Sequence, residues 1–181
     1  MLKFRYLNEN DVECRVAQMG EDWLTLLLYK NARVDMNILD ETVGPENWQR
    51  DHFENKGNLF CKIGINTNFG TDKPDRWVWK ADCGTESNTE KEKGESSDSF
   101  KRAGFCWGIG RELYTAPLIF IRKADKDGNP NYETMMKNNK ETLKGNFSVT
   151  KMIVKDGKIT GVNIEYARKR KTVFVFGNIF E

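Results

Sequence analysis

The chain has 181 residues, of which 38% are hydrophobic, so its length and composition suit one domain with a core of its own. Its 29 basic and 27 acidic side chains leave a net charge of only +2, and a nucleic-acid partner then requires that the cations gather on one surface. No apolar run approaches the roughly 18 residues of a membrane span, and the N-terminal MLKFRYLNEN lacks the apolar centre of a secretory signal.

The first expected elements are two strands, at residues 12–17 and 23–29, joined by a glycine turn. The second strand is almost continuously apolar, which is typical of a strand that is buried on both faces or lies centrally in a sheet. Lys30 and Asn31 then form a connection. Apolar residues at helical spacing predict a helix over 32–43, which a Gly-Pro pair ends.

Three further strands are predicted at 48–54, 59–65 and 76–81, with turn-forming residues between them. Alternation places Trp77 and Trp79 on the same face of this sheet. Aromatic rings can hold single strands by base stacking. At strand and helix spacing, however, they more often belong to a core, and this is the interpretation that we favour here for Trp77, Trp79 and the other large rings, namely Trp48, Phe105, Trp107 and Tyr114.

A long amphipathic helix is predicted over about 89–107. Four residues recur at spacings of four, three and four and so share one stripe of that helix: Ser96, Phe100, Ala103 and Trp107. Ser87 or Thr89 is the expected N-cap, with a glutamate three residues later to complete a capping box. Gly108 and Gly110 are expected to end the helix.

The rest of the chain is predicted to be peripheral. A short strand or hydrophobic clasp at 118–121 leads into a charged linker, 124–146, which has a weak helical segment near 131–143. Three short strands then form a small β-meander at 147–154, 158–166 and 172–176. The expected domains are a core at 1–123, the linker at 124–146 and an accessory meander at 147–181.

Three segments within residues 29–120 resemble Rad-fifty-two-type single-strand DNA annealing proteins of phages and prophages, the Rad-fifty-two/twenty-two double-strand break repair family: KNARVDMNILDETVGPENWQRD, NLFCKIGI and WVWKADCGTESNTEKEKGESSDSFKRAGFCWGIGRELYTAP. In that family a three-stranded antiparallel sheet is crossed by a long helix that carries a lysine-arginine-alanine string. The expected fold is therefore α+β, with an antiparallel sheet of β-hairpins packed by a long central amphipathic helix and a small C-terminal β-meander.

The resemblance implies that Lys101 and Arg102 are the family's DNA-contacting lysine and arginine. A further family arginine is replaced by Phe105 in this chain, and Arg111 is its expected substitute. Other cations that we expect to contact DNA lie near the helix and in the basic ARKRK stretch: Lys80, Lys91, Lys93, Arg168, Lys169, Arg170 and Lys171. The competing interpretation is a solvated helix face, on which glutamates pair with the lysines.

The implied function is ATP-independent binding of single-stranded DNA and annealing of complementary strands in phage or prophage recombination and repair. The resemblance further implies a homo-oligomeric ring or helical filament in the cytoplasm of a bacterial host, with a host single-strand binding protein as a further partner and no membrane or cofactor. One alternative is a module on the same fold that binds single-stranded DNA or host proteins without annealing.

A metal-dependent nuclease is the third hypothesis, with Asp82, Glu86 and Glu90 as clustered carboxylates. The chain has no phosphate loop or dinucleotide fingerprint, which argues against ATP use. Its four cysteines form no C-x-x-C pair and His52 is its one histidine, so the spacing argues against a zinc site, although four scattered thiolates could still form one. We therefore expect no metal, reduced thiols and no enzymatic activity.

Overall fold

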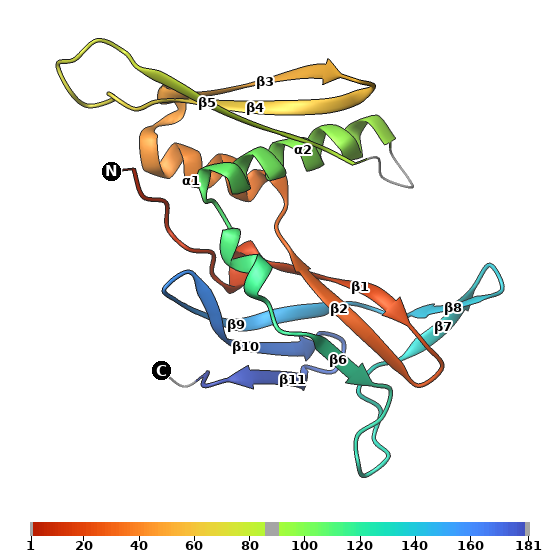
Figure 1. Cartoon of the computed structure of the whole chain (residues 1–181). Helices are drawn as coiled ribbons and strands as arrows, with labels where there is room; N and C mark the ends of the chain where they lie inside the picture. The colour runs from red at the N-terminus through yellow and green to blue at the C-terminus, as the bar shows by residue number, and fades with distance from the viewer. Residues whose placement is uncertain (1, 86–90, 180–181) are drawn as a thin grey trace. The chain divides into compact units, whose positions relative to one another are not determined.

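The computed structural model describes residues 2–85 and 91–179, and it divides into two units that we treat separately (Figure 1). Unit 1 consists of residues 1–6 and 30–111, and unit 2 of residues 7–29 and 112–181. The domain boundaries expected after residues 123 and 146 both fall inside unit 2.

Unit 1 contains a three-stranded antiparallel sheet in the order β3-β4-β5. Its elements are α1 (Ala32–Val43), η2 (Pro45–Asn47), β3 (Trp48–Asn55), β4 (Asn58–Asn66), β5 (Trp77–Cys83) and α2 (Lys91–Trp107). The side chain of Asn31 accepts hydrogen bonds from the backbone N–H groups of Arg33 and Val34, which caps the start of α1. Gly44, with φ of 82°, ends it. The elements expected between residues 32 and 81 are therefore present.

Helix α2 lies against β4 and β5 with the stripe expected from its sequence. Phe100 and Ala103 are fully buried, and the indole Nε1 of Trp107 donates to the carbonyl oxygen of Ile63 at 3.0 Å. The helix ends at Trp107, and Gly108 follows with a positive φ of 100°, which a glycine adopts without strain. The expected capping residues Ser87, Thr89 and Glu90 lie outside the described residues, and so does the side chain of Glu92.

Unit 2 is built on a six-stranded sheet in the order β11-β10-β9-β1-β2-β6. The remaining elements, of which only the first residue of η3 belongs to unit 1, are η1 (Glu9–Asp11), β1 (Glu13–Met19), β2 (Trp23–Tyr29), η3 (Arg111–Thr115), β6 (Ile119–Arg122), β7 (Thr134–Lys137), β8 (Lys140–Leu143), β9 (Phe147–Lys155), β10 (Lys158–Tyr166) and β11 (Lys171–Gly177). Alternate residues of these strands form its core, among them Leu24, Ile121 and Val162, all at most 1% exposed.

The expected α+β fold, organised around a central helix, is wrong for the chain as a whole. The described residues form eleven strands and two α-helices, so the protein is mostly β. The expected small meander is not peripheral, because β9, β10 and β11 supply half of the largest sheet and β9 pairs with β1 at Ser148 and Glu13. The edge strands β11 and β6 also approach each other, which leaves this sheet nearly closed.

The meander is part of the main sheet because three strands alone cannot cover their own apolar face. Val162, Ile164 and Tyr166 of β10 are completely buried, and a sheet of three strands on its own would leave one face of such residues in water. The N-terminal hairpin, β1 and β2, joins the same sheet and completes the core. Pairing between strands more than 120 residues apart leaves no mark in local periodicity.

The weak helix expected near residues 131–143 is also wrong. This segment forms the β7–β8 hairpin, in which Met136 pairs with Glu141 and Lys137 with Lys140. Its two turn residues, Asn138 and Asn139, have φ of 50° and 59°. Asparagine tolerates this left-handed conformation, and two such residues in succession make the tight turn that suits the twist of paired strands.

Candidate nucleic-acid interface

Lys101 and Arg102 lie on α2, off the buried stripe, and each is held by one carboxylate. The Lys101 Nζ atom is 3.7 Å from an oxygen of Asp98, one turn earlier, and a guanidinium nitrogen of Arg102 is 3.4 Å from an oxygen of Asp82 on β5. The two side chains are 23% and 41% exposed. Ion pairs that face water in this way stabilise a fold by only about 0–1 kcal/mol, so an incoming phosphate can replace either carboxylate.

Lys80 and Arg111 gather at the C-terminal end of α2. The Lys80 Nζ atom donates to the carbonyl oxygen of Cys106 at 3.0 Å and lies 4.6 Å from the centre of the Trp107 ring. The Arg111 guanidinium donates to the carbonyl oxygens of Phe105, at 2.7 and 3.1 Å, and of Cys106, at 3.1 Å. Both cations thus bind carbonyl groups that the end of a helix leaves without an intrahelical partner. That Arg111 substitutes for the family arginine remains a prediction.

Lys91 and Lys93 belong to the first turn of α2, and their side chains lie outside the described part of the chain. The basic ARKRK stretch connects β10 and β11 and belongs to unit 2. Structure and sequence together therefore assign the predicted cations to two groups, six in unit 1 and four in unit 2.

Most of the four cations of unit 2 are already paired with acidic residues of the same unit. Arg168 and Lys169 approach Glu133 at 3.8 and 2.9 Å, and Lys171 approaches Asp125 at 2.9 Å. The hydrogen bond from Lys169 is the main cause that lowers the pKa of the Glu133 carboxyl below its usual value. Arg170 makes no ion pair with any described residue. These pairs face water about as much as those of Lys101 and Arg102 do, so they are no stronger and an incoming phosphate can replace them in the same way.

A buried ion pair that the sequence did not reveal supports the turn of α2 that carries Lys101. Lys30 and Asp35 are paired with each other, and both are almost completely inaccessible to solvent. The Lys30 Nζ atom also lies 3.4 Å from the carbonyl oxygen of Lys101 and 4.3 Å from the centre of the Phe105 ring. A side chain at Gly104 would collide with the Asp35 carboxylate, so glycine permits this close approach of α2.

The surroundings of Asp35 change its acidity. Burial raises the pKa of this carboxyl to about 6, and the charge of Lys30 opposes that rise. One carboxylate oxygen of Asp35 has no hydrogen-bond partner among the described residues. Lys30 was expected only to lie in a connection, because an isolated lysine before a helix carries no pattern that indicates burial.

The large aromatic residues fall on both faces of the sheet in unit 1. Trp48 contacts Phe100, with ring centres 6.1 Å apart, and so lies on the face that α2 covers, and Trp107 of α2 packs against that same face. Trp77 and Trp79 share the opposite face, as alternation predicted, and Trp79 is 41% exposed. The interpretation as core is therefore wrong for Trp79, and it is also wrong for the exposed Tyr114 of unit 2.

The described residues contain no group of three or more His, Cys, Asp or Glu side chains that could hold a metal ion. Of the carboxylates suggested for a nuclease, Asp82 is paired with Arg102, whereas Glu86 and Glu90 lie outside the described residues. The four cysteines are free thiols. Within residues 2–85 and 91–179, no helix is long and apolar enough to cross a membrane.

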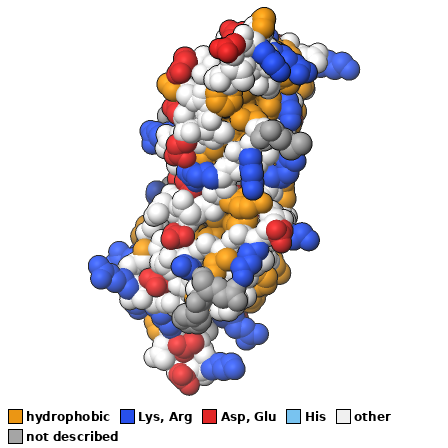
Figure 2. All heavy atoms as spheres, turned by 90° about the vertical axis from the view of Figure 1, so that its left-hand side faces the viewer, with side chains coloured by type: hydrophobic (Ala, Val, Ile, Leu, Met, Phe, Trp, Pro, Cys, Tyr) orange, Lys and Arg blue, Asp and Glu red, His pale blue; other side chains and the backbone are white. Residues whose placement is uncertain are grey.

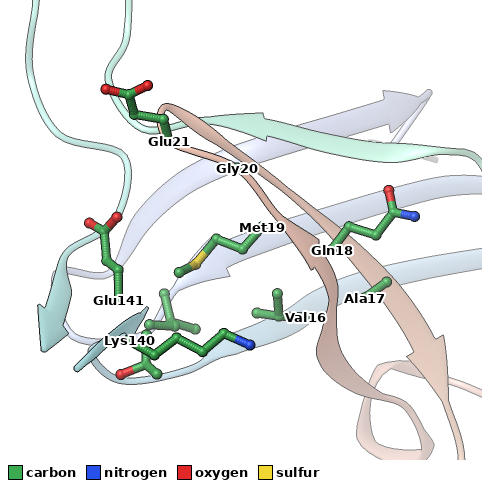
Figure 3. Close-up of a pocket in the computed structure, with 10 residues that line it drawn as sticks. Val16, Ala17, Gln18, Met19, Gly20, Glu21, Lys140 and Glu141 are labelled. Carbon is green, nitrogen blue, oxygen red and sulfur yellow. The ribbon is translucent and has the colours of Figure 1, made fainter. Parts of the chain in front are cut away.

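A pocket of about 650 Å³ in unit 2 lies between the end of β1 and the β8 strand (Figure 3). Met19 and Val16 give it an apolar wall, and Lys140 and Glu141 lie at its side. The Glu141 carboxylate already accepts hydrogen bonds from Lys123, at 2.7 Å, and Thr134, at 2.5 Å. Of the charged side chains that line the pocket, Glu141 is thus already bound to other residues of the same unit.

In the view of Figure 2, lysine and arginine side chains alternate with hydrophobic and acidic ones. No family model, curated protein or solved structure matches this chain. The choice of interface therefore depends on the local geometry of each cation.

Proposed function

We propose that the protein binds single-stranded DNA through Lys101 and Arg102 and anneals complementary strands without ATP, in the recombination and repair system of a phage or prophage. The observation that carries this proposal is the placement of two neighbouring cations off the buried stripe of α2, each in a weak, solvent-facing ion pair. The sequence resemblance to single-strand annealing proteins supports the same two residues.

In the proposed mechanism, the two side chains bind successive phosphates of one strand. Neighbours on an α-helix diverge by about 100°, so Lys101 and Arg102 reach different phosphates rather than the same one. A phosphate then takes the place of Asp98 beside Lys101, and another takes the place of Asp82 beside Arg102. Phosphate contacts carry no sequence information and leave the base edges free to pair with a second strand.

The two phosphate contacts of one protein chain bind DNA weakly. An oligomer binds the same DNA strand tightly, because after the first subunit has bound, the contacts of the other subunits form within one complex. The proposal therefore includes a homo-oligomer, as a ring or a helical filament. It also includes the cytoplasm of a bacterial host as the place of action, with the host's single-strand binding protein as a partner on the same DNA.

The proposal is tested by mixing two complementary oligonucleotides, each labelled with one dye of an energy-transfer pair, with the protein in EDTA and without nucleotide. We expect annealing to be faster than in buffer alone, and the acceleration to fall as salt is raised, because phosphate contacts release counterions. Binding without acceleration would indicate a module that only holds single strands. Cleavage after magnesium is added would indicate a nuclease, and a protein that stays monomeric on DNA would contradict the oligomer.

A further inference from the structure

The three-stranded sheet of unit 1 has one face that no described element of that unit covers. Figure 1 shows α1 and α2 on the same side of β3, β4 and β5. Arg50, whose guanidinium lies 4.9 Å from the centre of the Phe100 ring, and His52, which contacts Ser96, point from β3 towards α2. Since side chains alternate along a strand, the intervening residues point the other way.

Four aromatic rings and one lysine lie on this uncovered side, which we call the aromatic face: Phe53, Phe60, Lys62, Trp77 and Trp79. The rings form two pairs with nearly parallel planes. Phe53 and Phe60 have centres 5.4 Å apart and planes inclined by 22°, and Trp77 and Trp79 have centres 6.4 Å apart and planes inclined by 30°. Phe53 and Trp79 are the outer members, 37% and 41% exposed.

The indole of Trp79 lies flat on the sheet, and Gly64 makes this possible. A Cβ atom at Gly64 would lie only 2.8 Å from three atoms of that ring, so the ring rests on bare backbone. One face of the indole is therefore packed on the sheet. The residue as a whole is 41% exposed, so part of the ring stays accessible to a planar group that approaches the sheet.

Lys62 is placed among these rings. Its Nζ atom lies 5.1 Å from the centre of the Trp79 ring and 5.9 Å from that of Phe53, and it pairs with Asp51 at 3.1 Å. Contacts between proteins tend to exclude lysine and aspartate from their centres. Sites for single-stranded nucleic acids, in contrast, combine stacking rings with cations. Aromatic rings suit both kinds of contact, so it is the lysine among these rings that favours a nucleic acid over a second protein surface.

We propose that the aromatic face is a second nucleic-acid contact of unit 1, at which bases of a single strand stack on Trp79 and Phe53 while Lys62 stays close to the backbone phosphates. The proposal shares its ligand with the proposed function and adds to it a contact to bases, on the side of the sheet opposite Lys101 and Arg102. Stacking engages the flat face of a base, so the edge that pairs with a complementary strand stays free.

The test compares two fluorescent 30-nucleotide probes, one of thymidine and one that carries abasic sites throughout, in binding titrations with the full chain. We expect the wild-type protein to bind the thymidine probe about ten-fold more tightly, the size of one stacking contact. The variant Trp79→Ala should lose most of this preference, because only the smaller ring of Phe53 remains to stack on, and should keep the affinity of the wild-type protein for the abasic probe. Trp79→Phe, which retains a ring, should preserve most of the preference.

Phe53→Ala gives an independent reading if Trp79→Ala does not fold, because Phe53 lies on a different strand and does not rest on Gly64. It should also reduce the preference for bases. Equal binding of the two probes by the wild-type protein would overturn the inference and leave phosphate binding intact, whereas no binding of either probe would overturn the proposed function. The variants could instead keep the preference for the thymidine probe and, without DNA, have a lower molecular mass in solution than the wild-type protein. This result would identify the aromatic face as a contact between copies of this chain.

Discussion

Alanine at both Lys101 and Arg102 is expected to reduce the affinity of the protein for single-stranded DNA roughly ten-fold or more at physiological salt. Neither residue belongs to the buried stripe of α2, and alanine favours the helical conformation, so unit 1 should stay folded. Loss of the ion pairs to Asp98 and Asp82 should change the free energy of unfolding by no more than about 1 kcal/mol each.

The measurement is a salt titration of binding to an oligothymidine. The slope of log affinity against log salt should fall by about 0.7 for each phosphate contact that is lost, with no change in base preference. A matched control is the double variant Lys137→Ala and Lys140→Ala, which removes the same charge from the tip of the β7–β8 hairpin. If both double variants bind like the wild-type protein, Lys101 and Arg102 form only a solvated helix face.

Alanine at Lys30 is expected to destabilise unit 1 by about 3–5 kcal/mol at neutral pH, because it leaves the buried Asp35 carboxylate without its counter-ion. The same change removes the cation next to Phe105 and the carbonyl of Lys101. Denaturant unfolding followed by tryptophan fluorescence measures the loss. Lys73→Ala is the matched control, since Lys73 is an exposed lysine of the same unit, and it should cost less than about 0.5 kcal/mol.

The cost of Lys30→Ala should depend on pH. Burial raises the pKa of Asp35 to about 6, above its usual value of 3.8, so the folded state holds this proton more tightly than the unfolded state does. The stability that Asp35 contributes is then fully present below pH 3.8 and is lost as pH rises through about 6. Lys30→Ala should therefore cost more at pH 7.5 than at pH 5, where Asp35 is protonated. A cost that does not vary between these pH values would contradict the assignment of Asp35 as the buried partner.

The parts of the fold that could be predicted are those that local pattern determines. The helices at 32–43 and 91–107 and the hairpin strands between them follow from apolar periodicity and turn residues that lie close together in the chain. The pairing of β1 with β9 and the burial of Val162 could not be predicted, because they depend on segments far apart in sequence. For the same reason, the fold class expected from residues 29–120, about half of the chain, was wrong for the whole.

The candidate site was predictable only in part, for a related reason. Spacing alone placed Lys101 and Arg102 off the buried stripe of α2, and alternation alone placed Trp77 and Trp79 together. Neither pattern says which face of the sheet the helix covers, so the exposure of Trp79 could not be foreseen. The pairing of Lys62 with rings from two neighbouring strands requires the register of the sheet, which places Lys62 opposite Asp51 and Ala81.

The order of the chain through the two units has a consequence for synthesis on the ribosome. The hairpin of β1 and β2 emerges early from the ribosome. Strand β9, which pairs with β1, begins only at Phe147, after the whole of unit 1 has been made. At the slower end of the usual rate, about 5 residues per second, the edge of β1 waits roughly 20 seconds or more for its partner. An open strand edge is a template for pairing with other chains. Nascent chains held close together on one messenger RNA should therefore be most prone to cross-pairing in that interval, and a pause after unit 1 would lengthen it.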